Sequence, residues 1–197
     1  MRVLVVHAHP DPDSFAGALA KAALAGLRNG GHDTRLIDLY AEDFQPVMSQ
    51  ADRVAYDTEA GFVDPAVGVY AEHVAWAEAM VFVYPTWWSG MPAVMKGWLE
   101  RVLVPGVAFR LDEKTRKVTP ALHHIRHVAG VSTYGSPRPY VTVLTDGGRR
   151  TVTRALRMVC GARCRSTWLA LYGMDRRTDA ERRAFLARVE RELAAIR

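Results

Sequence analysis

The sequence alternates short apolar runs with segments of helical periodicity along its whole length, and this alternation limits the possible folds more than any other feature. Continuous apolar runs are typical of strands that are buried on both faces, as in a parallel sheet. Parallel neighbours need a crossover connection, which is usually a helix, and the intervening segments have a helical period. The pattern therefore predicts an α/β fold built on a parallel sheet.

The expected elements can be placed by residue number. The strands are expected at 2–7, 34–39, 80–84, 127–133 and 166–171. The helices are expected at 14–29, 64–77, 91–103, 139–158 and 179–196, with a break in the fourth at Asp146, Gly147 and Gly148. Five strands and five helices fit a doubly wound fold of flavodoxin type, with helices on both faces of the sheet.

Length and composition set the broad class. The 197 residues are 49% hydrophobic and 24% charged, which predicts one globular domain over residues 1–197. No run is long and apolar enough for a membrane span, and the chain begins directly with a strand, so we expect no membrane insertion and a cytoplasmic location. Cys160 and Cys164 lack the spacing of a redox or zinc pair and are expected to be inert.

The net charge of +5 suits an anionic partner, and six arginines lie close together in the last third of the chain. They are Arg149, Arg150, Arg154, Arg157, Arg163 and Arg165. No recognition helix or aromatic-flanked basic motif accompanies them, so nucleic acid is an unlikely partner.

Ligands of a doubly wound sheet bind beyond the carboxyl ends of its strands, which directs attention to loops 7–14, 85–92 and 133–140. The first loop has three interpretations. Its histidines and carboxylates are metal ligands by type, and AHPDPD is close to the AHPDD of zinc-dependent deacetylases, but Pro12 replaces the required Asp. Ser14 could instead cap a helix whose N-terminus holds a phosphate. The third interpretation is that His9 and Ser14 cap the turn and the helix without any ligand.

The other two loops carry aromatic and small residues. Trp87 and Trp88 either cover the core or stack on a flat heteroaromatic ligand, and the second interpretation explains both tryptophans better. In the third loop, Gly135 lets backbone N–H groups approach a ligand closely, although a plain turn would have the same composition.

Four segments together carry a family resemblance. They are VLVVHAHPDPDSF, DLYAEDFQPVMS, YPTWWSGMPAVMKGWLERVL and STYGSPRPY. In these segments the chain resembles the NAD(P)H:quinone oxidoreductases of flavodoxin-like fold, which include DT-diaphorase, the bacterial drug-activity modulators and the ancillary oxidoreductases of potassium-efflux systems. The resemblance implies bound FAD, with FMN as the alternative, and ping-pong hydride transfer from NADH or NADPH to a quinone-like acceptor. It also implies a homodimer. A flavin-binding regulatory subunit of a membrane transporter is the alternative function.

The resemblance also assigns site residues. The contacts to the cofactor's pyrophosphate and ribityl chain would come from His9, Asp13, Ser14 and Phe15. The flavin ring would lie along Pro85, Thr86, Trp87, Trp88 and Ser89, and against Ser132, Thr133, Tyr134 and Gly135. Tyr140 matches the tyrosine that balances charge during hydride transfer and is the catalytic candidate. Three positions depart from the family pattern: Ser89 stands for an aromatic residue, Tyr134 for a glycine and Asp146 for a histidine.

Overall fold

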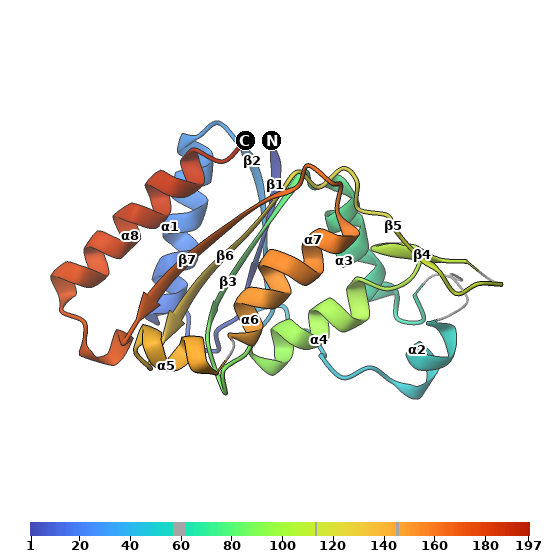
Figure 1. The fold of residues 1–197 in the computed structure, drawn as a ribbon, viewed down its shortest axis with the longest axis horizontal. Helices are drawn as coiled ribbons and strands as arrows, with labels where there is room; N and C mark the ends of the chain where they lie inside the picture. Colours follow the sequence, from blue (N-terminus) through green and yellow to red (C-terminus); the bar gives the residue numbers. More distant parts are fainter. Residues whose placement is uncertain (57–61, 113, 145) are drawn as a thin grey trace.

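The computed structural model describes residues 1–56, 62–112, 114–144 and 146–197, and its centre is a five-stranded parallel sheet (Figure 1). The strands, in chain order, are β1 (Arg2–His7), β2 (Asp33–Asp38), β3 (Ala79–Pro85), β6 (His127–Tyr134) and β7 (Arg165–Tyr172). Their order in the sheet is β2-β1-β3-β6-β7, and all neighbours are parallel. The predicted doubly wound fold of flavodoxin type is confirmed, and the strand order reverses between β1 and β3.

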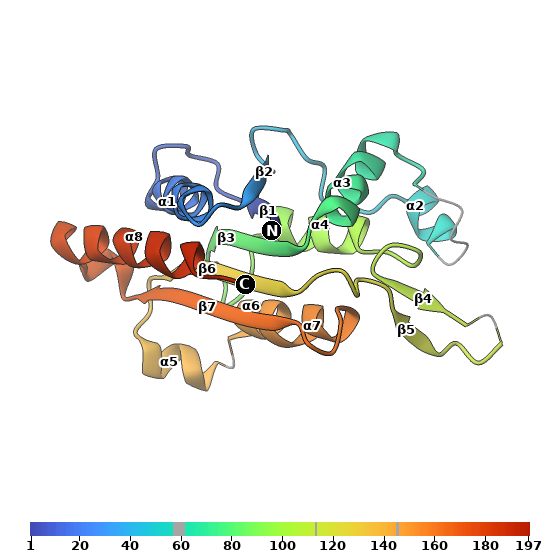
Figure 2. The same ribbon diagram turned by 90° about the horizontal axis from the view of Figure 1, so that it is seen from above.

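Helices cover both faces of this sheet (Figure 2). On one face, α1 (Phe15–Asn29) and α8 (Asp179–Ala194) pack against Val3 and Val5 of β1. On the other face, α3 (Pro65–Trp76), α4 (Ala93–Val102) and α7 (Leu156–Val159) pack against Leu4 and Val6. Successive side chains of a strand point to opposite faces, so continuous apolar strands supply both cores.

The predicted helical segment at 139–158 is interrupted, as expected, but the interruption comes before Gly147, and the segment has more parts than expected. Four short elements stand there: α5 (Arg138–Val143), α6 (Gly147–Arg150), the π-helical turn η1 (Thr151–Ala155) and α7. Asp146 adopts a left-handed conformation with φ 38° and accepts the Arg149 N–H at 3.2 Å, so it caps α6. Gly147 and Gly148 therefore begin a helix and do not interrupt one.

Four elements were not expected from the sequence. They are α2 (Gln50–Ala55), the antiparallel pair β4 (Phe109–Leu111) and β5 (Val118–Pro120), and the 3-10 turn η2 (Met174–Arg176). They are short, and neither α2 nor η2 contains a buried residue, so they leave no apolar period to detect. None of the helices in the described ranges has both the length and the apolar character of a membrane span.

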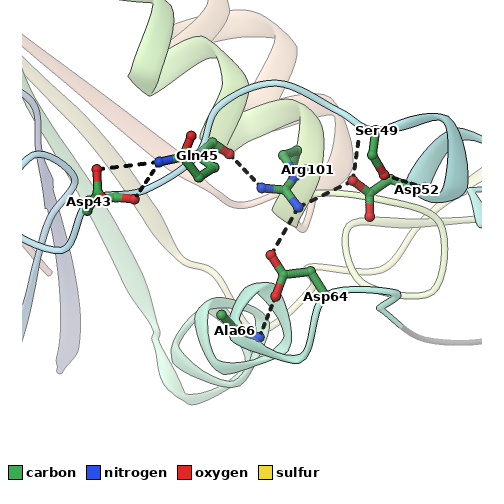
Figure 3. Close-up of polar contacts among 7 residues, drawn as sticks. All are labelled: Asp43, Gln45, Ser49, Asp52, Asp64, Ala66 and Arg101. Atoms are coloured by element: carbon green, nitrogen blue, oxygen red, sulfur yellow. Dashed lines mark hydrogen bonds and ion pairs between the residues drawn. The ribbon is translucent and has the colours of Figure 1, made fainter.

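The buried guanidinium of Arg101 links α4 to α2 and to the N-terminus of α3 (Figure 3). The Arg101 side chain, only 6% exposed, extends from α4 and donates to Asp52 of α2 at 3.3 Å and to Asp64 at 3.2 Å. It also donates to the Gln45 carbonyl at 2.5 Å. Asp64 in turn caps α3 by accepting the Ala66 N–H. Burial alone would raise the pKa of Asp52, but hydrogen bonds from Ser49 and the charge of Arg101 hold that pKa below its ordinary value.

Candidate functional site

The three predicted loops meet at the carboxyl edge of the sheet, at the bottom of Figure 1. The Ala8 N–H donates to the Val83 carbonyl at 3.1 Å, which joins the end of β1 to β3. The Thr86 N–H donates to the Thr133 carbonyl at 2.8 Å, which joins the second loop to β6. The site therefore lies where the strand order reverses, the position at which doubly wound sheets bind ligands.

The first loop is held by its own polar groups. His9 Nδ1 accepts the Asp11 N–H at 3.0 Å, and the Asp11 carboxylate accepts the Asp13 N–H at 2.9 Å. Ser14 Oγ caps α1 by accepting the Gly17 N–H at 3.1 Å. Both capping contacts of the ligand-free interpretation are thus present. The first-turn N–H groups of Phe15 and Ala16 have no acceptor within the helix, so they remain available to an anion.

A glycine brings this loop close to the helix. A Cβ atom added to Gly17 would lie 2.3 Å from the Pro12 carbonyl oxygen, a distance that carbon and oxygen cannot adopt without movement. The Pro-rich turn can therefore fold back over the N-terminus of α1 only because residue 17 is glycine.

The histidines of the first loop are already engaged. His7 is buried, and its Nδ1–H donates to the Val83 carbonyl at 3.1 Å. Burial is the main cause that lowers the pKa of His7, against the raising effect of Asp38. Within the described residues, no three His, Cys, Asp or Glu side chains lie close enough together to hold a metal ion.

The second loop is a two-residue hairpin turn. Trp87 and Gly90 exchange backbone hydrogen bonds of 3.1 and 3.0 Å, and the two residues between them, Trp88 and Ser89, have φ of 48° and 59°. Positive φ at both central positions is the geometry of a type I′ turn, which normally holds asparagine and glycine. Two larger L-residues in this geometry make the loop strained.

Neither tryptophan of this loop covers the core. Trp87 is 41% exposed, and its ring centroid lies 6.0 Å from that of His9, so the first and second loops are in contact. The Trp88 side chain is fully exposed. The strained turn therefore presents an open indole face that no described residue covers, a surface suited to stacking on a flat ligand.

Two residues at the end of β6, directly before the third loop, hold the second loop in place. Ser132 is completely buried, and its hydroxyl lies 2.9 Å from that of Thr86. Thr133 is also buried, and its carbonyl accepts the Thr86 N–H. Ser132 and Thr133 therefore position Thr86, whereas Gly135 is exposed and faces solvent at the end of β6.

Tyr134, which replaces a family glycine, points inward. Its ring is stacked on that of Tyr172 with centroids 4.6 Å apart, and its hydroxyl donates to the Asp146 carboxylate at 3.0 Å. Burial, followed by the charge of Asp146, raises the pKa of Tyr134. Asp146 thus binds Tyr134, and within the described residues no hydrogen bond joins it to Tyr140.

An open cleft of about 500 Å³ lies among these loops. Its walls include Thr86, Trp88, Ser89, Tyr134, Gly135 and Tyr140. Tyr140 is 56% exposed, and no residue in the described ranges hydrogen-bonds its hydroxyl. The volume falls in the range of small-molecule sites, and the lining combines aromatic faces with a few polar groups.

Two further tyrosines near this edge of the sheet were not singled out from the sequence. Tyr84 lies near the end of β3, beside Ser132 of β6, and Tyr172 ends β7, beside Tyr134. The Tyr84 hydroxyl is buried without a hydrogen-bond partner in the described residues, and burial, followed by the Asp146 charge, raises its pKa. The sequence signal for these residues is that each of three neighbouring strands has a tyrosine at or near its carboxyl end.

Comparison with known proteins identifies relatives of this chain. NAD(P)H dehydrogenase (quinone) 1 of Rattus norvegicus is 33% identical over 123 residues, which are 55% of this chain and 45% of that protein. The chain spans about half the length of the curated relatives that it matches.

Solved structures match over the whole fold. An NAD(P)H:quinone oxidoreductase from Methanothermobacter marburgensis has a TM-score of 0.83 and 26% identity, and the match covers 98% of this chain and 96% of that one. The FMN-dependent NADH-azoreductase of Bacillus anthracis, solved in complex with FMN, has a TM-score of 0.75 and 14% identity over 98% and 97% of the two chains, a likeness of fold alone. The family profile described as flavodoxin-like fold matches residues 1–194. The chain therefore belongs to the flavodoxin-like fold family.

Proposed function

We propose that this chain is a flavin-dependent oxidoreductase that takes hydride from NADH or NADPH and passes it to a quinone-like acceptor in a ping-pong reaction. The observation that carries the proposal is the cleft beside β3 and β6, where a strained turn presents an exposed indole opposite Tyr140. Relatives named for NAD(P)H and quinone support the substrate class.

The residues present fit a flavin. The cleft is wide enough for a fused ring, and Trp88 offers it an exposed aromatic face. The N-terminus of α1 offers N–H groups for phosphate, and Phe15 lies half-buried in its first turn. A bound flavin would supply the capacity to accept and release a hydride, which no amino-acid side chain has.

The chain's own groups would bind, orient and shield the reactants. Thr86, held by Ser132 and Thr133, fixes the height of the second loop over the sheet. Pro85 is the buried last residue of β3, directly before that loop. The N–H of Gly135 and the hydroxyls of Ser89 and Thr86 are donors near the cleft for ring oxygens.

Tyr140 is the group best placed to act during hydride transfer. Its hydroxyl has no partner among the described residues and lines the cleft, so it is free to donate to a ring oxygen where negative charge develops. Stabilisation confined to the transition state raises kcat more than it changes KM. Asp146 does not replace the relay histidine, because its carboxylate accepts from Tyr134. Tyr140 would therefore act without a protein relay behind it.

The identity of the flavin, the assembly and the location belong to the same proposal. We propose FAD, because loop residues His9, Asp13 and Ser14 resemble those of FAD-binding relatives, with FMN as the alternative. We also propose a homodimer in the cytoplasm, as the resemblance implies. Light scattering of the purified protein measures the assembly.

The decisive experiment is the absorption spectrum of the purified protein, followed by mass measurement of the released cofactor and elemental analysis. We expect about one flavin per chain, with the mass of FAD, and bleaching of its visible band on addition of NADPH. If the released cofactor has the mass of FMN, the bound flavin is FMN and not FAD, and the proposed reaction stays the same. A colourless protein that takes up neither flavin and contains one zinc per chain would overturn the proposal in favour of the deacetylase interpretation.

A further inference from the structure

A second hollow, separate from the cleft, lies between α5, α6, η1 and the end of β7. It has a volume of about 350 Å³. Four arginines line it: Arg138, Arg149, Arg150 and Arg154. They come from two segments of the chain, so the hollow is built by the fold and not by one charged run. Of the six clustered arginines in the sequence, only three belong to it.

The arginines of the hollow form no ion pair with any described residue. Within the described ranges no carboxylate forms an ion pair with any of the four, whereas Arg101, Arg126 and Arg177 are each paired. The single carboxylate in the lining, Asp146, already accepts from the Tyr134 hydroxyl and the Arg149 N–H. The hollow therefore keeps a strong positive potential.

The backbone under these arginines is fixed. The Thr142 hydroxyl donates to the Arg138 carbonyl at 2.9 Å, and the Thr153 hydroxyl donates to the Arg149 carbonyl at 2.8 Å. Guanidinium groups that line one hollow from fixed turns suit phosphoryl groups, because each can donate two parallel hydrogen bonds. A divalent cation or an apolar ligand would be repelled or left without contacts.

The hollow and the cleft adjoin each other. Val141 of α5 lines both, and Asp146, which lines the hollow, binds the Tyr134 side chain that lines the cleft. Residues of α5 line both of them, and a helix of six residues is about 9 Å long. A ligand with its ring in the cleft needs only to pass α5 to place a phosphoryl group among the arginines.

We propose that this hollow binds a phosphoryl group of the nicotinamide dinucleotide and so selects the hydride donor. The inference rests on the proposed function, because it assumes that the nicotinamide enters the cleft. The phosphoryl group has two possible sources: the pyrophosphate that NADH and NADPH share, and the 2′-phosphate that only NADPH carries.

The test compares the wild-type flavin-loaded protein with the Arg149→Gln/Arg150→Gln double variant. Binding of NADP⁺ and NAD⁺ is measured by calorimetry, without turnover. We expect the double variant to bind NADP⁺ about 10-fold more weakly, since two charge-assisted hydrogen-bonding groups are lost. An equal loss for NAD⁺ identifies the pyrophosphate, and a loss confined to NADP⁺ identifies the 2′-phosphate. In both cases the wild-type affinity should fall as salt is added.

Arg163→Gln/Arg188→Gln is the matched control, because it removes the same two charges from exposed positions outside the lining of the hollow. We expect it to bind NADP⁺ as the wild type does. Unchanged NADP⁺ affinity in the double variant, an equal loss in the control, or no binding by the wild type would overturn the proposal.

A kinetic arm separates the hollow from the reaction. Reduced nicotinamide riboside has the same reactive ring but no phosphoryl group, so the ratio of kcat/KM for NADPH to that for the riboside should fall about 10-fold in the double variant. An unchanged ratio would refute the subsite while the reaction stands. If no donor reduces the flavin, the proposed function fails, and the calorimetry still decides whether the hollow binds phosphoryl groups.

Discussion

Replacing Trp88 with glycine should separate binding from stability. The side chain is fully exposed, so its removal uncovers no apolar surface in the folded protein. Its φ of 48° disfavours an L-residue by roughly 1 kcal/mol, which glycine relieves. Glycine also gains freedom in the unfolded chain, by roughly 0.5 kcal/mol. We therefore expect unchanged or slightly higher stability, with a rise in Tm of no more than about 2 °C.

Flavin binding, in contrast, should become weaker in Trp88→Gly. One stacked face of an indole would bury roughly 100 Å², worth about 2.5 kcal/mol at 25 cal/mol per Å². Ordering the side chain offsets about 1 kcal/mol of this. A net loss of about 1.5 kcal/mol corresponds to a roughly tenfold higher Kd for flavin in Trp88→Gly.

The assay is titration of the flavin-free protein with FAD and with FMN, followed by flavin fluorescence, together with thermal unfolding. Met158→Ala is the control, because it removes another exposed apolar side chain, 77% exposed, from outside the cleft. The control should change neither quantity. A drop in Tm of 5 °C or more in Trp88→Gly would show that the indole packs on the protein, and an unchanged Kd would refute its stacking on the ligand.

Three further predictions test other parts of the molecule. Tyr140→Phe should retain flavin but slow its reduction about 10-fold in stopped flow, since only the hydroxyl is lost; an unchanged rate removes Tyr140 from the mechanism. Hydrogen bonds from Thr178 and Arg177 lower the pKa of Glu181 from 4.5 to about 2, so its contribution to stability is complete above pH 4.5 and disappears as the pH falls through 2. Plots of Tm against pH should therefore be flatter for Glu181→Gln over that window, and parallel curves would contradict this. Arg101→Met leaves Asp52 and Asp64 facing each other and should reduce stability by about 2 kcal/mol in denaturant unfolding, whereas the exposed control Arg191→Met should not.

The sheet could be predicted because parallel strands carry their burial in the sequence. Strand β1 was placed without error, and β2 lies within one residue of its predicted position. Topology then located the site, since carboxyl ends of parallel strands share one edge. The β4–β5 pair and α2 could not be predicted, because they contain no buried residue, and α2 also depends on a distant ion pair with Arg101.

Side-chain directions at the site could not be read from the sequence. Trp88 and Ser89 form a type I′ turn without the asparagine or glycine that signals one, because the neighbouring Thr86 is fixed to the sheet on one side and Pro92 begins a helix on the other. Tyr134 lines the cleft, and its hydroxyl and ring also contact Asp146 and Tyr172, which the sequence did not indicate. Whether a strand-end side chain points up or down depends on register, which one sequence leaves open.

The Arg101 contact links α2 to the rest of the fold through charge. No residue of α2 is fully buried, so the ion pair between Arg101 and Asp52 contributes to holding this helix in place. Such a segment can unfold and refold many times during one lifetime of the folded sheet. Amide protons of α2 should therefore exchange with solvent on a timescale independent of β1 and β3, and added salt, which weakens ion pairs, should shorten that timescale while the strands remain protected.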